Sequence, residues 1–195
     1  GAFTTNDHKL AKKIRKLTLH GMSKDGWKRF SSNGKWAYDV SELGYKYNMT
    51  DIAASFGIQQ LNYLSKWAQK RLEIVRKYNY SFNQISGIII PYGIDEEYHA
   101  RHLYIIRIKE NLWKINRNQI INKINEKGIG TSVHYIPIHM HSYYANKYNY
   151  RKMDYENSYK LSKSVITLPL YPALNQKQIL FITDTINQIW MKYKR

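Results

Sequence analysis

Residues 50–82 carry the longest helical pattern of the chain, and this pattern constrains the fold more than any other feature. Apolar and aromatic side chains recur there at the spacing of a helix. They are Ile52, Phe56, Tyr63, Trp67, Leu72, Val75 and Tyr78. Asn48 or Thr50 can cap the first turn. Because a single helix of this length exceeds the usual globular range, the sequence predicts one helix or two helices joined near Trp67.

Shorter elements precede this helix. Residues 1–5 are expected to form a short strand. Thr5 or Asn6 can cap a helix that continues through Leu17 and ends before Gly21. Residues 21–48 have no clear period and are rich in glycine and aromatic residues, so they are expected to form a long loop. A long aperiodic loop in a compact protein is often functional.

Short strands alternate with helices after residue 85. The predicted strands are 88–91, 102–108, 132–135 and 166–168, and the predicted helices are 116–128, 155–165 and the segment from 176 to the end. Asn175 and Gln178 match a capping box at the start of the last helix. The alternation indicates an α/β or α+β domain.

The chain of 195 residues has no cysteine and a net charge of +17, with 31 Lys and Arg against 14 Asp and Glu. The absence of cysteine excludes a disulfide framework, a cysteine nucleophile and a thiolate metal site. No apolar run of about 18 residues predicts a membrane span, and no signal peptide is expected. The sequence therefore predicts a cytoplasmic protein. The charge suits an anionic partner, but the lysines are scattered, and this favours compositional drift over nucleic-acid binding.

Three local clusters are candidates for chemistry. Residues 44–48 (GYKYN) combine a glycine, two tyrosines, a cation and an amide before a helix, which suits either an anion site or an ordinary capped helix start. Residues 128–139 place His134 on a predicted strand and His139 beyond the end of that strand. No nearby carboxylate completes a metal site, so substrate contact or surface exposure is favoured for both. Residues 99–102 (HARH) are expected to be a solvated strand start.

Taken in order, a series of segments resembles the DegT/DnrJ/StrS family of sugar aminotransferases that use pyridoxal phosphate. The segments are residues 1–7 (GAFTTND), 20–22 (HGM), 43–54 (LGYKYNMTDIAA), 60–61 (QL), 102–104 (HLY), 128–135 (GIGTSVHY) and 168–172 (LPLYP). Their order and approximate spacing follow the family from end to end. The resemblance implies the C-terminal part of a fold-type-I aminotransferase. It divides the chain into a remnant of the large cofactor domain (1–49), a connecting helix or helices (50–84) and a small domain with a mostly antiparallel sheet (85–195).

The resemblance also implies what lies outside this sequence. Family members are about twice as long, and their Schiff-base lysine lies upstream of the segment that matches Gly1. Pyridoxal phosphate is therefore expected in the intact family enzyme and not on this chain alone, which is expected to lack a catalytic residue and to be inactive by itself. A second copy or a separate N-terminal half is the expected partner.

The remaining site expectations follow from the same resemblance. Lys46, Tyr47 and Asn48 match a segment that reaches the cofactor phosphate of the partner subunit, although many members have Asn and Arg where this chain has Lys46 and Asn48. His134 matches a histidine that faces the nucleotide-sugar substrate, and Tyr135 and His139 are weaker matches. Two other functions stay open, a basic nucleic-acid-binding module that uses residues 21–48 and a non-catalytic scaffold.

Overall fold

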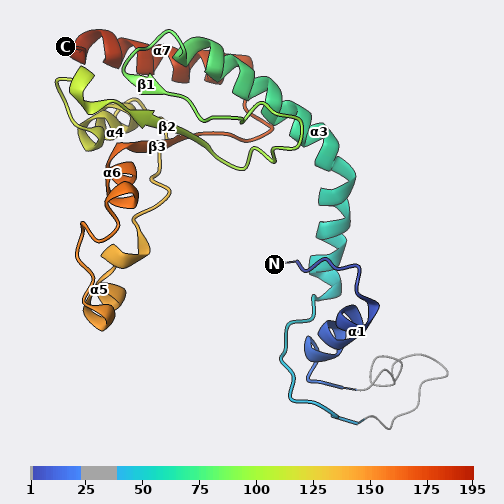
Figure 1. Cartoon of the computed structure of the whole chain (residues 1–195). Coiled ribbons are helices and arrows are strands. Elements are labelled where there is room, and N and C mark those ends of the chain that lie inside the picture. Colours follow the sequence, from blue (N-terminus) through green and yellow to red (C-terminus); the bar gives the residue numbers. More distant parts are fainter. Residues whose placement is uncertain (1, 23–38) are drawn as a thin grey trace. The chain divides into compact units, whose positions relative to one another are not determined.

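The structure is a computed structural model that describes residues 2–22 and 39–195 (Figure 1). The chain divides into two compact units, residues up to 62 and residues 63–195. Helix α3 (Asp51–Phe82) begins in the first unit and ends in the second. It is one continuous helix of 32 residues, so the alternative of two helices joined near Trp67 is wrong. Thr50 caps its start, because the Thr50 hydroxyl accepts a hydrogen bond from the Ala53 N–H at 3.3 Å.

The first unit contains helix α1 (His8–Leu17) and an extended segment that returns beside its C-terminal end. Asp7, rather than Thr5 or Asn6, caps α1, since its carboxylate accepts the N–H groups of Lys9 and Leu10. Residues 2–5 form no strand, which corrects the prediction for that segment. Leu19 and Met22 are the only buried apolar residues in the described part of this unit.

The second unit is built on an antiparallel sheet of three strands in the order β1-β2-β3. The strands are β1 (Ile88–Ile89), β2 (Tyr104–Ile108) and β3 (Val165–Leu168). The predicted strand at 132–135 is wrong. Only Ser132 pairs with the sheet, through reciprocal backbone hydrogen bonds with Thr167 at 3.2 and 2.8 Å. The chain leaves the sheet directly after Ser132 and approaches Pro137, which has no N–H for a ladder.

Helices α4 (Arg117–Asn125), α6 (Glu156–Ser164) and α7 (Gln176–Tyr193) confirm three predicted elements. The capping box of Asn175 and Gln178 is present, and Asn116 forms a second one with Gln119. Helix α5 (Ser142–Tyr148) and the short helices η1 (Glu110–Leu112) and η2 (Ile138–Met140) were not predicted. No helix that the structure describes is long and apolar enough to cross a membrane.

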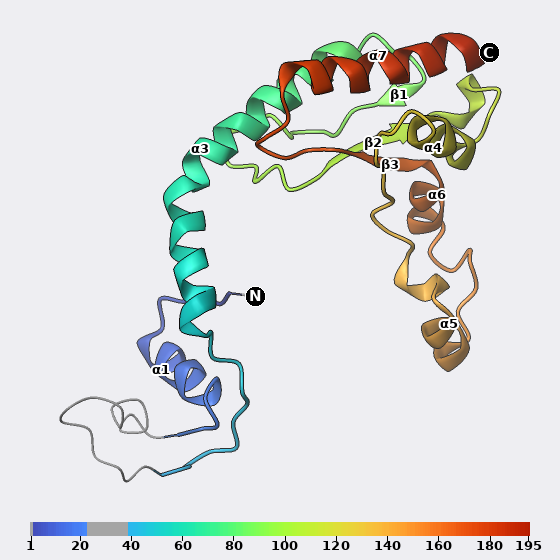
Figure 2. The ribbon, with the colours of Figure 1, turned by 180° about the vertical axis from the view of Figure 1, so that it is seen from behind.

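The hydrophobic core lies in the second unit, where α7 and the last turns of α3 run along one face of the sheet (Figure 2). The rings of Tyr78, Phe82 and Tyr104 meet in this core, with centroids 4.9 to 6.2 Å apart. Burial raises the pKa of both tyrosines, because the ionised form would lose its hydration. Their hydroxyls are satisfied by the Pro169 carbonyl at 2.9 Å and by Asn79 Oδ1 at 2.8 Å. The core therefore connects α3 directly to the segment that follows β3.

Candidate functional site

The loop before α3 is held against the end of α1 by backbone contacts that only glycine allows. Gly21 has a φ of +69°, and a Cβ there would lie 1.8 Å from the Glu42 carbonyl oxygen. A Cβ on Gly44 would lie 2.1 Å from the Gly21 nitrogen. The N–H of Tyr45 donates to Leu17 O at 2.7 Å, and the N–H of Tyr47 donates to Thr18 O at 2.8 Å. These contacts position Lys46, Tyr47 and Asn48 at the entrance to α3.

The three predicted cofactor-side residues differ in their surroundings. Lys46 and Tyr47 are exposed, and the Tyr47 ring stacks on that of Tyr45 with centroids 5.1 Å apart. Asn48 Oδ1 is buried and has no hydrogen-bond partner among the described residues. A buried acceptor without a donor costs about 1–3 kcal/mol. Among the described residues, Asn48 Oδ1 therefore remains available to accept a hydrogen bond.

The second predicted group, which contains His134, Tyr135 and His139, is divided by the structure. His134 Nδ1 lies 2.8 Å from Thr167 Oγ1, and its ring meets the exposed Tyr135 ring edge-on at 4.6 Å. His139 is buried against the Tyr155 ring, and its Nε2 lies 3.3 Å from Lys152 O. His139 is thus held by packing within its own segment, whereas His134 and Tyr135 are the pair that a ligand can reach. Nowhere in residues 2–22 and 39–195 do three His, Asp or Glu residues gather as metal ligands.

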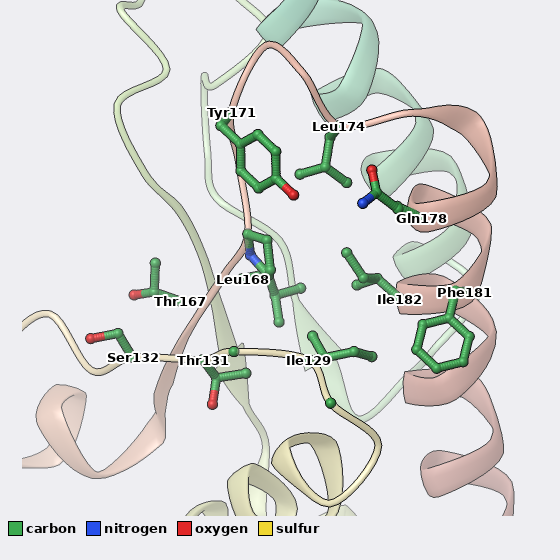
Figure 3. Close-up of a pocket in the computed structure, with 13 residues that line it drawn as sticks. Ile129, Thr131, Ser132, Thr167, Leu168, Tyr171, Leu174, Gln178, Phe181 and Ile182 are labelled. Carbon is green, nitrogen blue, oxygen red and sulfur yellow. The ribbon is translucent and has the colours of Figure 1, made fainter.

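A cavity of about 610 Å³ lies between the 128–132 turn, the end of β3 and α7 (Figure 3). Among the residues that the structure describes, no charged side chain lines it, although the whole chain carries +17. Its polar groups come from Thr131, Ser132, Thr167, Tyr171 and Gln178. Thr167 joins this cavity to His134, because it lines the wall and also bonds the imidazole. Sequence reasoning missed Thr167, although it directly precedes the LPLYP segment at 168–172.

The third sequence cluster, residues 99–102, has a structural explanation. Arg101 is buried with a φ of 51°, and its guanidinium donates to His99 O at 2.7 Å and to Glu96 O at 2.5 Å. The Arg101 N–H also donates to His99 Nδ1 at 2.9 Å. These bonds close the loop before β2 on itself. The expected solvated strand start is therefore wrong for Arg101, while His102 is exposed.

The fold is that of sugar aminotransferases. The Streptococcus pneumoniae protein Spr1654, described as a candidate sugar aminotransferase and solved in a PMP form, matches with a TM-score of 0.83 and 33% identity. The match covers 96% of this chain and 46% of that protein. Helicobacter pylori PseC, an aminotransferase involved in the biosynthesis of pseudoaminic acid, shares the fold with a TM-score of 0.84 at 22% identity.

The sequence profile of the DegT/DnrJ/EryC1/StrS aminotransferase family matches residues 1–187, and the chain belongs to this family. The spore coat polysaccharide biosynthesis protein SpsC of Bacillus subtilis is 41% identical over 190 residues, which are 97% of this chain and 49% of SpsC. The UDP-4-amino-4-deoxy-L-arabinose–oxoglutarate aminotransferase of Shewanella sediminis is 32% identical over 195 residues, 50% of its length. The chain thus spans about half the length of the curated relatives that it matches.

Pyridoxal phosphate is the cofactor of this family, and Spr1654 was also solved in a PLP form. Among the described residues of the loop before α3, Lys46 is the cation that could hold the phosphate of that group. The Lys46 ammonium is exposed beside the N-terminus of α3, and both features attract an anion. Asn48 Oδ1 cannot bond a phosphate oxygen, because both atoms are acceptors. Asn48 could contact a phosphate only through its amide nitrogen.

Proposed function

We propose that this chain is the C-terminal portion of a pyridoxal-phosphate-dependent nucleotide-sugar aminotransferase. The reaction transfers an amino group from a glutamate-like donor to a keto-sugar nucleotide, in the cytoplasmic synthesis of a cell-surface polysaccharide or a modified sugar. The observation that carries the proposal is the family match over residues 1–187, together with relatives named for sugar amination and polysaccharide synthesis.

This chain's own residues would bind and orient, and the cofactor, when bound, would supply the electron sink for the reaction. Lys46 would neutralise the cofactor phosphate, and the loop fixed by Gly21 and Gly44 would hold Lys46 in place. His134 and Tyr135 would contact the nucleotide sugar. The family resemblance implies that the lysine that binds the cofactor lies upstream of the segment that matches Gly1, so the chain alone is expected to be inactive.

The proposal includes a partner that covers the first half of α3. Ile52 and Phe56, one turn apart on one side of the helix, are 74% and 69% exposed, and Leu61 on another side is 70% exposed. Large apolar side chains exposed this close together on one helix mark a surface that a partner covers. Burial of each such side chain against a partner stabilises the complex by about 1.5–3 kcal/mol. A second copy or a chain equivalent to the first half of the relatives would supply this cover, and also a donor for Asn48 Oδ1.

The test is a pyridoxal phosphate titration of the 195-residue chain, followed by borohydride reduction and mapping of the adduct by mass. Scattered or absent labelling is expected. Stoichiometric labelling of one lysine, with a glutamate-dependent spectral change, would overturn the expected inactivity of the chain alone.

A second arm adds the first half of SpsC as a separate polypeptide, and a glutamate-dependent spectral change is expected in the complex. Lys46→Gln should weaken cofactor retention there, because a positive charge at the phosphate is lost. Lys12→Gln, which removes an exposed charge from α1, is the matched control and should behave as the unmodified chain. A complex that forms without any glutamate-dependent change would refute the proposed activity.

A further inference from the structure

The hydroxyl of Thr167 lies within hydrogen-bond distance of the His134 imidazole. Thr167 lies on β3, is only 6% exposed, and exchanges both backbone hydrogen bonds with Ser132. Its Oγ1 lies 2.8 Å from His134 Nδ1. The backbone of Thr167 is thus held by the sheet and by Ser132, while its side chain reaches a histidine that lies beyond the sheet.

The direction of this hydrogen bond can be argued from the partners of the two atoms. A neutral imidazole carries one N–H and one bare nitrogen, and a threonine hydroxyl carries one proton. If Nδ1–H donated to Oγ1, the hydroxyl proton would have no acceptor within the described residues around a nearly buried side chain. If the hydroxyl donates to Nδ1, its proton is satisfied. The second arrangement leaves the imidazole proton on Nε2.

We infer that Thr167 is a positioning residue that fixes His134 as the Nε2–H tautomer. The imidazole then presents a hydrogen-bond donor, and no acceptor, on the side away from Thr167. The fitting ligand atom is an oxygen acceptor, such as a phosphate or hydroxyl oxygen, and not an amine or a hydroxyl proton. The use of this donor on a nucleotide sugar rests on the proposed function, whereas the tautomer itself does not.

The same contact accounts for how His134 keeps one orientation. The imidazole is only half-buried, and its ring neighbour Tyr135 is 70% exposed, so packing restrains it weakly. A hydrogen bond from a strand residue opposes the ring flip that would put Cδ2 in the place of Nδ1. Thr167 also lines the uncharged cavity of about 610 Å³.

The test is nitrogen NMR of the full 195-residue chain labelled with ¹⁵N-histidine, at a pH where the imidazole is neutral. The chain has only 7 histidines, and His134→Gln identifies the resonance pair of interest. The expected result is a protonated Nε2 and a bare Nδ1 for His134. A protonated Nδ1, or an equal mixture of tautomers, would overturn the inference without any further variant.

Three variants separate positioning from structural support. Thr167→Val keeps the shape of the side chain and removes its hydroxyl. The ratio of the Nε2–H to the Nδ1–H tautomer of His134 should then fall by about threefold to tenfold, as expected for one lost hydrogen bond. Thr167→Ser should restore the single tautomer. Thr183→Val is the matched control, because Thr183 is equally buried but its hydroxyl donates to Leu180 O at 3.0 Å. An unchanged ratio in Thr167→Val, or an equal fall in Thr183→Val, would contradict the role of Thr167.

Titration with UDP in the same spectra tests the proposed function separately. A shift of His134 Nε2 on addition of UDP, with a Kd that rises about threefold to tenfold in Thr167→Val, supports both the inference and the function. The other outcome is a single Nε2–H tautomer of His134 that does not respond to UDP, either in the chain alone or in its complex with the first half of SpsC. This result upholds the positioning role of Thr167 and counts against the nucleotide-sugar assignment.

Discussion

Replacement of Tyr78 by Phe should show how strongly α3 is tied to the segment after β3. The Tyr78 ring is fully buried and contacts Phe82 and Tyr104, and its hydroxyl donates to Pro169 O at 2.9 Å. Phenylalanine keeps the ring and its packing, so no cavity large enough to matter is created. The change removes the hydroxyl and leaves a proline carbonyl without its donor.

The expected cost follows from those two effects. A net hydrogen bond contributes about 0.5–1.5 kcal/mol, and an acceptor left buried without a partner adds to the loss. Pro169 is half-buried and lines the cavity, so water can reach its carbonyl in part. The free energy of unfolding should therefore fall by about 1–2 kcal/mol. With a urea slope of about 2 kcal/mol per molar, the midpoint should drop by about 0.5–1 M.

The assay is urea unfolding of the full chain followed by the fluorescence of its tryptophans, of which Trp113 and Trp190 lie in the core. Tyr80→Phe is the matched control, because Tyr80 is on the same helix but 79% exposed, and its midpoint should move little. Amide exchange at Leu170 and Tyr171 should also become faster in Tyr78→Phe. A midpoint equal to that of the unmodified chain would refute the conclusion that this hydrogen bond stabilises the second unit.

Three further predictions test other parts of the structure. Gly44→Ala should displace the loop before α3, because its Cβ would overlap the Gly21 backbone, and cofactor retention in the complex with the first half of SpsC should be lost. Asn175→Ala should lower the free energy of unfolding by about 1 kcal/mol in urea titrations, since the first turn of α7 loses its cap, and an unchanged midpoint would contradict this. Because burial raises the pKa of Tyr78 and Tyr104, both are protonated in the folded chain and ionise in the unfolded chain above about pH 10. Their contribution to stability is complete below about pH 10 and is lost as the pH rises beyond it, so alkaline unfolding should expose both tyrosines to ionisation in one cooperative step.

Local sequence signals predicted most helices because they act over a few residues. The capping box of Asn175 and Gln178 and the helical period of residues 50–82 both depend on contacts between neighbours in the chain. The same locality explains the errors. Residues 132–135 could form a strand only if several of them paired with β3. Only Ser132 pairs with it, through Thr167. Thr5, Asn6 and Asp7 are adjacent polar residues that could each cap α1. In the structure the Asp7 side chain accepts the N–H groups of the first turn.

The candidate site shows the same division. The GYKYN segment and His134 were identified from a series of motifs, and the structure holds the first against the end of α1 and the second against Thr167. Residues 23–38, most of the aromatic-rich loop that the nucleic-acid alternative required, lie outside the described residues. The division of the chain into three parts at 49 and 84 stays a prediction, beside the two compact units that the contacts define.

The sequence by itself determined the α/β class, the family and the helical character of residues 51–82, because these depend on periodicity, caps and motif order. Only the tertiary structure decided that His139 is buried packing, that Arg101 closes a loop and that Thr167 holds His134. These contacts join residues such as 134 and 167, which are 33 positions apart in the chain. No local pattern encodes a pair of that kind, because its energy exists only once the sheet has brought the two side chains together.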